Sequence, residues 1–202
     1  MQYRDYDRAV SDHAAPTTRP LRADARRNRD QVLAVAREML STGGSSVSFD
    51  EIARRAGVGV GTVYRHFPTR AALFEAVVLG RIEKFVERAR TLSADSAVPG
   101  DAFRDYFAYL VGDIALNQAL CEALDGDPGT ALSVPDQLRS DFVEWFDRLL
   151  CQAKEAAEVR ADVDIADVLD LLIGAAVAER RARLRAAPNR SIAVVLDGLR
   201  PR

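Results

Sequence analysis

Apolar residues recur every three or four positions along most of this 202-residue chain. This spacing is typical of amphipathic helices, because residues three and four apart share one helix face. Ala, Leu, Arg and Glu, which favour helix, are abundant, and no run of alternating β-branched residues indicates a sheet. The pattern therefore predicts an all-α protein.

The first predicted helix runs from Asp24, as its N-cap, to about Ser41, where a pair of glycines ends it. Residues 1–22 are polar and contain two prolines, which predicts a disordered tail. Arginines near the end of this tail, among them Arg26, have two open interpretations. They form a basic arm along DNA, or they keep a solvated tail soluble.

Residues 48–67, SFDEIARRAGVGVGTVYRHF, predict a helix, a tight turn and a second short helix. Ser48 and Glu51 have the spacing of a capping box at the start of the first helix. Gly57 stands where a residue with positive φ would end that helix, and the second helix is expected over 62–67. This layout is a helix-turn-helix, which places its second helix in the major groove of DNA.

The second of these helices carries side chains that suit a duplex. Hydroxyl, guanidinium and imidazole groups bind phosphates and base edges, and Arg is the best partner for guanine. Thr62 and Arg65 are the candidates for base contacts, Gly61 allows a close backbone approach, and Val60 is a candidate for a thymine methyl. Val63 and Phe67 are expected to attach the helix to the rest of its domain.

The stretch IARRAGVGVGTVYRHFPTRAALFEAV resembles the DNA-binding signature of the tetracycline-repressor (TetR) family, and the similarity extends back through residues 29–43. The resemblance implies a three-helix helix-turn-helix DNA-binding domain over 23–69. It also implies phosphate contacts from Tyr64, His66 and Arg70. The candidate DNA-binding residues are Arg26, Ser48, Val60, Gly61, Thr62, Tyr64, Arg65, His66 and Arg70.

Thr69 is the predicted cap of a linking helix over 70–92, which leads into a larger helical domain over 93–202. Further helices are expected from Asp101, over 116–124 and from Asp136 as N-cap. Breaker residues predict a loop over 125–135, and one interpretation of this loop is a gate.

Aromatic and aliphatic stripes in this larger domain have two interpretations. They form an ordinary core, or they line a pocket for a small apolar effector. The candidate ligand-binding residues are Phe103, Tyr106, Phe107, Leu110, Trp145, Phe146 and Leu149.

The segment 163–184 is apolar on more than one face, and a second short apolar helix follows over 191–199. The family resemblance implies that two such helices pair with their copies as a four-helix bundle in a two-fold homodimer. The alternative is burial inside one chain. The candidate dimerisation residues are Ile165, Val168, Leu172, Ala176, Ile192, Val195 and Leu196.

The net charge of −2 hides an asymmetry between the two predicted parts. Residues 1–70 carry 12 Arg against 8 acids, whereas the remainder carries 16 basic and 22 acidic side chains. Positive charge displaces counterions from DNA phosphates, so the N-terminal part is expected to face the duplex and the acidic part to point away.

Several classes of site are not indicated. The two cysteines and two histidines lack metal-ligand spacing, and neither a phosphate loop nor a nucleophile elbow is present. We therefore expect no enzymatic activity, no metal and no cofactor. No apolar run approaches a membrane span, and the N-terminus lacks a secretory signal, so a cytoplasmic protein without membrane association is expected.

These observations predict a sequence-specific DNA-binding transcriptional regulator. Its partners would be a palindromic operator, a second copy of the chain and a small apolar effector that releases a repressor from DNA. Two alternatives remain open, namely a ligand-independent DNA-binding protein of the same fold and an all-helical partner-binding module.

Overall fold

The computed structural model describes residues 18–41, 48–95, 98–116 and 134–201. Every regular element in these ranges is an α-helix, which confirms the predicted all-α class. None of the described helices is both long enough and apolar enough to cross a membrane. The helices are α1 (Thr18–Ser41), α2 (Phe49–Ala56), α3 (Val60–His66), α4 (Arg70–Asp95), α5 (Pro99–Ala115), α7 (Asp136–Glu155), α8 (Ile165–Leu184) and α9 (Arg190–Gly198).

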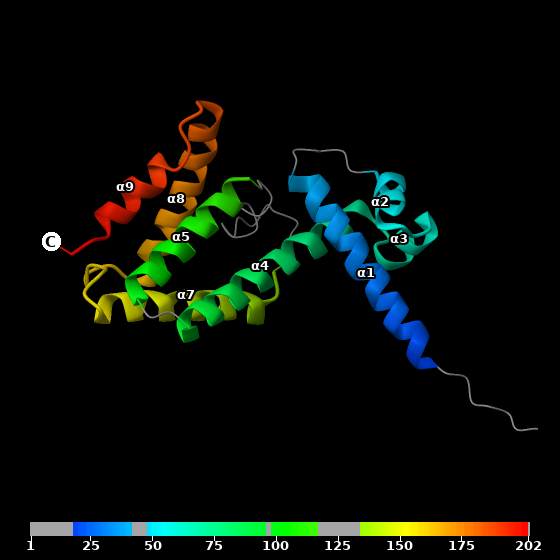
Figure 1. Cartoon of the computed structure of the whole chain (residues 1–202), viewed down its shortest axis with the longest axis horizontal. Coiled ribbons are helices and arrows are strands. Elements are labelled where there is room, and N and C mark those ends of the chain that lie inside the picture. Colours follow the sequence, from blue (N-terminus) through cyan, green and yellow to red (C-terminus); the bar gives the residue numbers. More distant parts are fainter. Residues whose placement is uncertain (1–17, 42–47, 96–97, 117–133, 202) are drawn as a thin grey trace, which may run out of the picture.

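The helices form two groups joined by α4 (Figure 1). Helices α1, α2 and α3 pack around the start of α4, where Leu73 and Val77 complete a small apolar core. Helices α5, α7, α8 and α9 pack with the rest of α4 around a second and larger core. Helix α4 thus contributes to both cores as one continuous helix.

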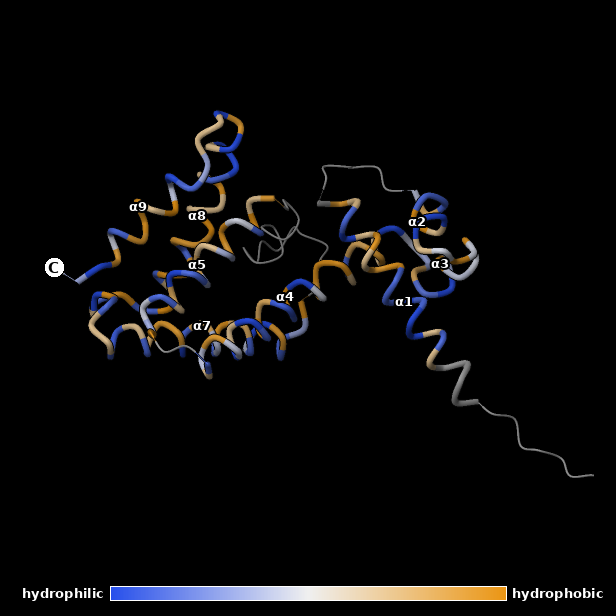
Figure 2. Tube along the Cα trace, viewed as in Figure 1, coloured by the Kyte–Doolittle hydropathy of each residue, from blue (hydrophilic) through white to orange (hydrophobic). Residues whose placement is uncertain are grey.

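Helix α4 begins as its sequence predicts and extends beyond the predicted end at residue 92. The Thr69 hydroxyl accepts a hydrogen bond from the Ala72 backbone N–H at 3.0 Å, which caps the first turn. Hydrophobic and hydrophilic positions alternate along α4 and α7 (Figure 2), as expected for helices that each bury one face. These two helices pack against each other along much of their length.

Several predicted boundaries are wrong. Helix α1 begins at Thr18, so the end of the expected disordered tail is helical, and Asp24 lies inside the helix and pairs with Arg27 instead of capping. Helix α5 begins at Pro99, and α7 has Pro135, not Asp136, as its N-cap. The predictions for residues 1–17 and 117–133 lie outside the described residues.

The start of α8 has a capping box that we did not predict from the sequence. The Asp164 carboxylate accepts the Asp167 backbone N–H at 2.9 Å, and the Asp167 carboxylate accepts the Asp164 N–H at 3.0 Å. This reciprocal pair fixes the first turn of α8. The helix then packs against α5, and α9 packs against α8.

Candidate functional site

Helix α2 has Ser48 as its N-cap and Gly57 as its C-cap. Ser48 has extended backbone angles, and its carbonyl accepts the Ile52 N–H at 3.0 Å. Gly57 has a φ of 67°, the left-handed conformation predicted for it, which glycine adopts at low cost. The turn that follows leads to α3.

Helix α3 begins at Val60, two residues before the predicted start, with Gly59 as its N-cap. Val63 and Phe67 are buried, as predicted, and attach α3 to the small core. A Cβ added at Gly61 would meet no atom within 4 Å, so the backbone of the first turn is open to an approaching ligand.

The exposed face of α3 presents polar and aromatic groups. Tyr64 is 54% exposed although its ring packs edge-on against Phe49, with centroids 4.8 Å apart. This contact orders the ring and leaves the rest of the side chain accessible. The predicted DNA contacts Arg26, Val60, Gly61, Arg65 and Arg70 are also exposed, whereas Ser48, Thr62 and His66 are half-buried.

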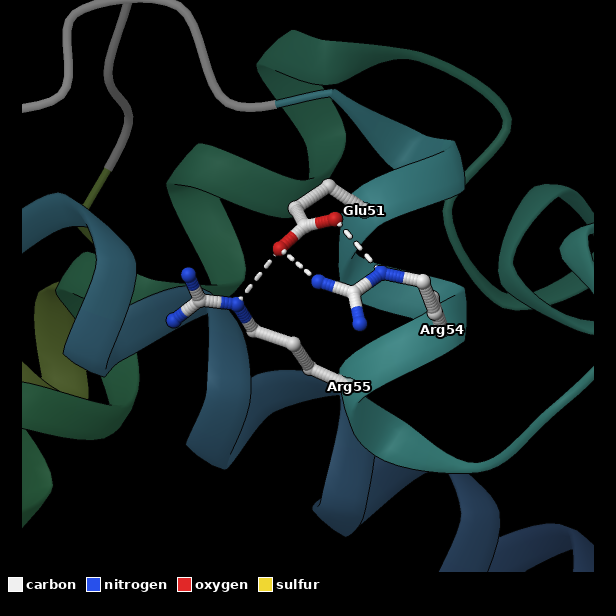
Figure 3. Close-up of polar contacts among 3 residues, drawn as sticks. All are labelled: Glu51, Arg54 and Arg55. Carbon is white, nitrogen blue, oxygen red and sulfur yellow. Dashed lines mark hydrogen bonds and ion pairs between the residues drawn. The ribbon is translucent and has the colours of Figure 1, made fainter.

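Helix α2, which packs against α3, carries an ion network (Figure 3). The Glu51 carboxylate accepts two hydrogen bonds from Arg54, at 2.8 and 2.6 Å, and one from Arg55 at 2.7 Å. Hydrogen bonds from Arg54 and then from Arg55 lower the pKa of Glu51 to about 2. The predicted capping box is therefore wrong, because Ser48 makes no side-chain cap bond and Glu51 is held by the arginines.

The predicted effector residues pack against one another in the larger core. Phe146 stacks on Phe103 at a centroid distance of 5.9 Å and meets the ring of Tyr106 edge-on at 5.1 Å. The Tyr106 hydroxyl donates to the Phe85 carbonyl at 3.0 Å, and burial raises the pKa of Tyr106. Six of the seven are fully buried, namely Phe103, Tyr106, Phe107, Leu110, Phe146 and Leu149.

These contacts favour the core interpretation of these residues over the pocket interpretation. The seventh predicted residue, Trp145, is half-buried and lies between the guanidinium groups of Arg90 and Arg148, at 5.3 and 5.2 Å from its ring centroid. An apolar cavity of about 240 Å³ does exist in this domain, but α4, α7 and α8 form it, and its lining includes none of the seven.

The predicted dimerisation residues divide into two groups. Val168, Leu172, Ala176 and Ile192 are buried in the larger core of the chain itself, which favours the alternative of burial inside one chain for these four. Ile165, Val195 and Leu196 are half-buried.

A groove between α8 and α9 exposes further small and apolar side chains, which are not among the seven candidate dimerisation residues. Leu171 and Val194 are among its exposed large hydrophobic residues. Both occur in helices that are apolar on more than one face, so periodicity alone did not separate them from the core residues.

Two family descriptions match this chain. Residues 32–77 match the bacterial regulatory proteins of the tetR family, and residues 98–201 match the C-terminal domain of SbtR-like transcriptional regulators. The second match alone covers half of the chain. The chain belongs to the TetR family of transcriptional regulators.

Solved structures and relatives agree with this family. A TetR transcription regulatory protein from Mycobacterium vanbaalenii is 41% identical, with 90% of this chain and 99% of that chain covered and a TM-score of 0.68. A TetR transcriptional regulator from Streptomyces coelicolor is 32% identical, with 86% and 98% covered and a TM-score of 0.68. An HTH-type transcriptional regulator from Staphylococcus aureus strain USA300 is 26% identical over 106 residues, which span 52% of this chain and 57% of that relative.

The match to the TetR N-terminal description spans α2 and α3 and reaches into α1 and α4. Arg26 lies outside the matched residues. Within the described residues of this TetR-family chain, no group of three or more His, Cys, Asp or Glu side chains converges as metal ligands would.

Proposed function

We propose that this protein is a homodimeric transcriptional repressor that binds a two-fold symmetric DNA operator and is released by a small apolar effector. The observation that carries the proposal is α3, whose buried Val63 and Phe67 support an exposed face with Tyr64 and Arg65. A short helix held on one side and polar on the other suits insertion into the major groove.

The proposed DNA contacts fall into two kinds. Arg65 and Thr62 would contact base edges, and Val60 would meet a thymine methyl. Tyr64, His66 and Arg70 would bind phosphates, which position the helix without selecting sequence. Ser48 and Arg26 would add contacts at the edges of this surface. The excess of Arg over acidic residues in the N-terminal part supports a duplex partner.

The proposed dimer surface is the exposed groove of α8 and α9. Leu171 and Val194 are 36% and 66% exposed, and the small residues Gly174 and Ala178 allow a second helix to approach closely. Val195 also lines the groove, and Ile165 and Leu196 are the other half-buried candidates. A second copy that covers this groove would bury apolar surface left open in one chain and place two α3 helices for two half-sites.

The proposed release by an effector is a matter of linkage. Consider two conformations that differ in the position of α4, of which only one binds the operator well. A ligand that binds the other conformation more tightly lowers DNA affinity, at most by the ratio of its affinities for the two conformations. Arg81 of α4 is paired with Asp113 of α5, with Nη2 2.7 Å from Oδ1, so α4 is attached to the larger domain as well as to the small core. Such a regulator would act in the cytoplasm, where the bacterial chromosome lies.

The test is selection of bound sequences from a random duplex library with the purified full chain. We expect enrichment of a two-fold symmetric sequence. The double variant Tyr64→Ala, Arg65→Ala should bind that sequence at least about a hundredfold more weakly, since it loses a base contact and a phosphate contact of about 1–3 kcal/mol each in every half-site. Because Tyr64→Ala also removes the ring contact with Phe49, a circular dichroism melt must show that the double variant is folded at the temperature of the binding measurement. No enriched sequence, or full binding by the double variant, would contradict the proposal.

A further inference from the structure

An apolar cavity of about 240 Å³ lies between α4, α7 and α8. Residues of these three helices line it, together with Val134 just before α7. Ile82, Phe142 and Leu172 are its most deeply buried lining residues. The complete lining is Ile82, Val134, Arg139, Phe142, Val143, Leu169, Leu172 and Ile173.

One lining residue differs in kind from the other seven. Arg139, on α7, is the only charged residue of the lining, and it is exposed. Among the described residues, its guanidinium makes no ion pair, hydrogen bond or ring contact. Arg148 on the same helix, by contrast, lies over the ring of Trp145. The guanidinium of Arg139 is therefore a cation that is not engaged by another described residue, at the edge of an apolar cavity.

We propose that this cavity binds a small monocarboxylic acid as its anion, with the apolar body inside and the carboxylate on Arg139. Two parallel N–H donors of a guanidinium match the two oxygens of a carboxylate. The carboxylate would stay at the exposed edge, so the charge need not be buried in the apolar interior.

The volume limits the size of the acid. Since a cavity of about 150 Å³ accepts benzene, this one would hold a molecule of about ten non-hydrogen atoms. A phosphate ester fits less well, because a dianion calls for more donors than one guanidinium, and the other seven lining residues are apolar.

The position of the cavity suggests how such an acid would act on DNA binding, a consequence that rests on the proposed function. Ile82 belongs to α4 and lies twelve residues after Arg70, about 18 Å along the helix at 1.5 Å per residue. A ligand against Ile82 thus contacts the helix that also supports the DNA-binding group.

The test is isothermal titration calorimetry of the full chain, without DNA, with octanoate, 3-phenylpropanoate and the neutral octanamide. We expect at least one of the two carboxylates to bind. Arg139→Gln should weaken carboxylate binding about tenfold or more, because it removes a charge-assisted pair, and should leave octanamide unchanged. Val143→Phe, which fills the cavity, should weaken all three.

Arg148→Gln is the matched control, since it removes an exposed arginine of the same helix outside the lining, and it should bind like the wild type. Circular dichroism melts would verify that each variant is folded. Failure of both carboxylates to bind, or equal binding by Arg139→Gln and wild type, would overturn the proposal. Operator release is measured separately, so binding without release would contradict only the proposed effector mechanism.

Discussion

Glu51 holds two exposed arginines of α2, the helix that precedes α3. Its carboxylate holds Arg54 and Arg55. Because these hydrogen bonds lower the pKa of Glu51 to about 2 from an ordinary 4.5, the network is fully present above pH 4.5 and is lost as pH falls through about 2. Titration of Glu51 should therefore not change DNA binding between about pH 5 and 8.

Replacement of Glu51 by Gln should strengthen DNA binding. The change removes one negative charge and frees Arg54 and Arg55 for phosphates, so affinity at low salt should rise and the salt slope should steepen by about one. Fluorescence anisotropy at several salt concentrations measures both quantities. Asp50→Asn changes the charge equally but frees no arginine, so an equal effect of the two substitutions would contradict this role of Glu51.

The role of a single residue could be predicted where it depends on the local backbone alone. Gly57 is needed for a positive φ, and Thr69 caps α4 as its position before a helical pattern indicates. The capping box at Ser48 failed because Glu51 is also three and four residues from two arginines, and sequence spacing cannot say which partner is taken. Arg54 offers Glu51 two parallel N–H donors and a full positive charge, whereas a backbone amide offers one neutral donor.

At the scale of elements, the connection from α8 to α9 depends on a buried acid. Glu179 is fully buried, and its two carboxylate oxygens accept the Asn189 backbone N–H at 3.0 and 2.9 Å. Arg183 approaches the same carboxylate at 3.2 Å. Asn189 has a φ of 66°, so this carboxylate holds an unfavourable backbone conformation at the start of α9.

Glu179→Gln should destabilise the protein. The amide has one acceptor oxygen in place of two and carries no charge for Arg183, so we expect a loss of about 1–3 kcal/mol in the free energy of unfolding. Urea denaturation followed by circular dichroism measures the change. Glu144→Gln, on the exposed side of α7, should alter stability by less than about 0.5 kcal/mol. If Glu179→Gln lowered the free energy of unfolding by no more than the Glu144→Gln control, the carboxylate would not hold the turn before α9.

The existence of the helices could be predicted from periodicity. Which face of a helix turns toward the core could not always be predicted. On α8, Val168, Leu172 and Ala176 face the core of the chain, while Leu171 and Gly174 are exposed. A helix that is apolar on several faces has no polar side to mark which face turns inward. For the same reason, the sequence allowed two interpretations of the aromatic residues of α5 and α7, a core and a pocket. Their mutual contacts in the structure favour the core.

At the scale of the whole molecule, α4 and the larger core connect the two proposed binding surfaces. The exposed face of α3 lies at one end of the molecule, and the groove of α8 and α9 lies in the other group of helices (Figure 1). The asymmetry of charge along the sequence, positive before residue 71 and negative after it, agrees with one DNA-facing end.

The dimer surface gives a prediction at this scale. Val194→Asp should convert the protein to a monomer, because a carboxylate at an exposed apolar position of the groove would be desolvated by a second copy. Sedimentation velocity measures the mass. Ala193→Asp, at an exposed neighbour that does not line the groove, is the control and should remain dimeric. A dimeric Val194→Asp protein would place the interface elsewhere.

The central claim is that two copies of α3 bind two related half-sites. The most direct measurement compares the affinity and stoichiometry of the full chain on the selected operator and on a duplex with one half-site scrambled. We predict two chains, or a multiple of two, on the intact operator and an affinity at least a hundredfold lower on the scrambled one, since several base contacts of about 1–3 kcal/mol each are lost. Equal affinity for the two duplexes, or one chain per operator, would contradict the account.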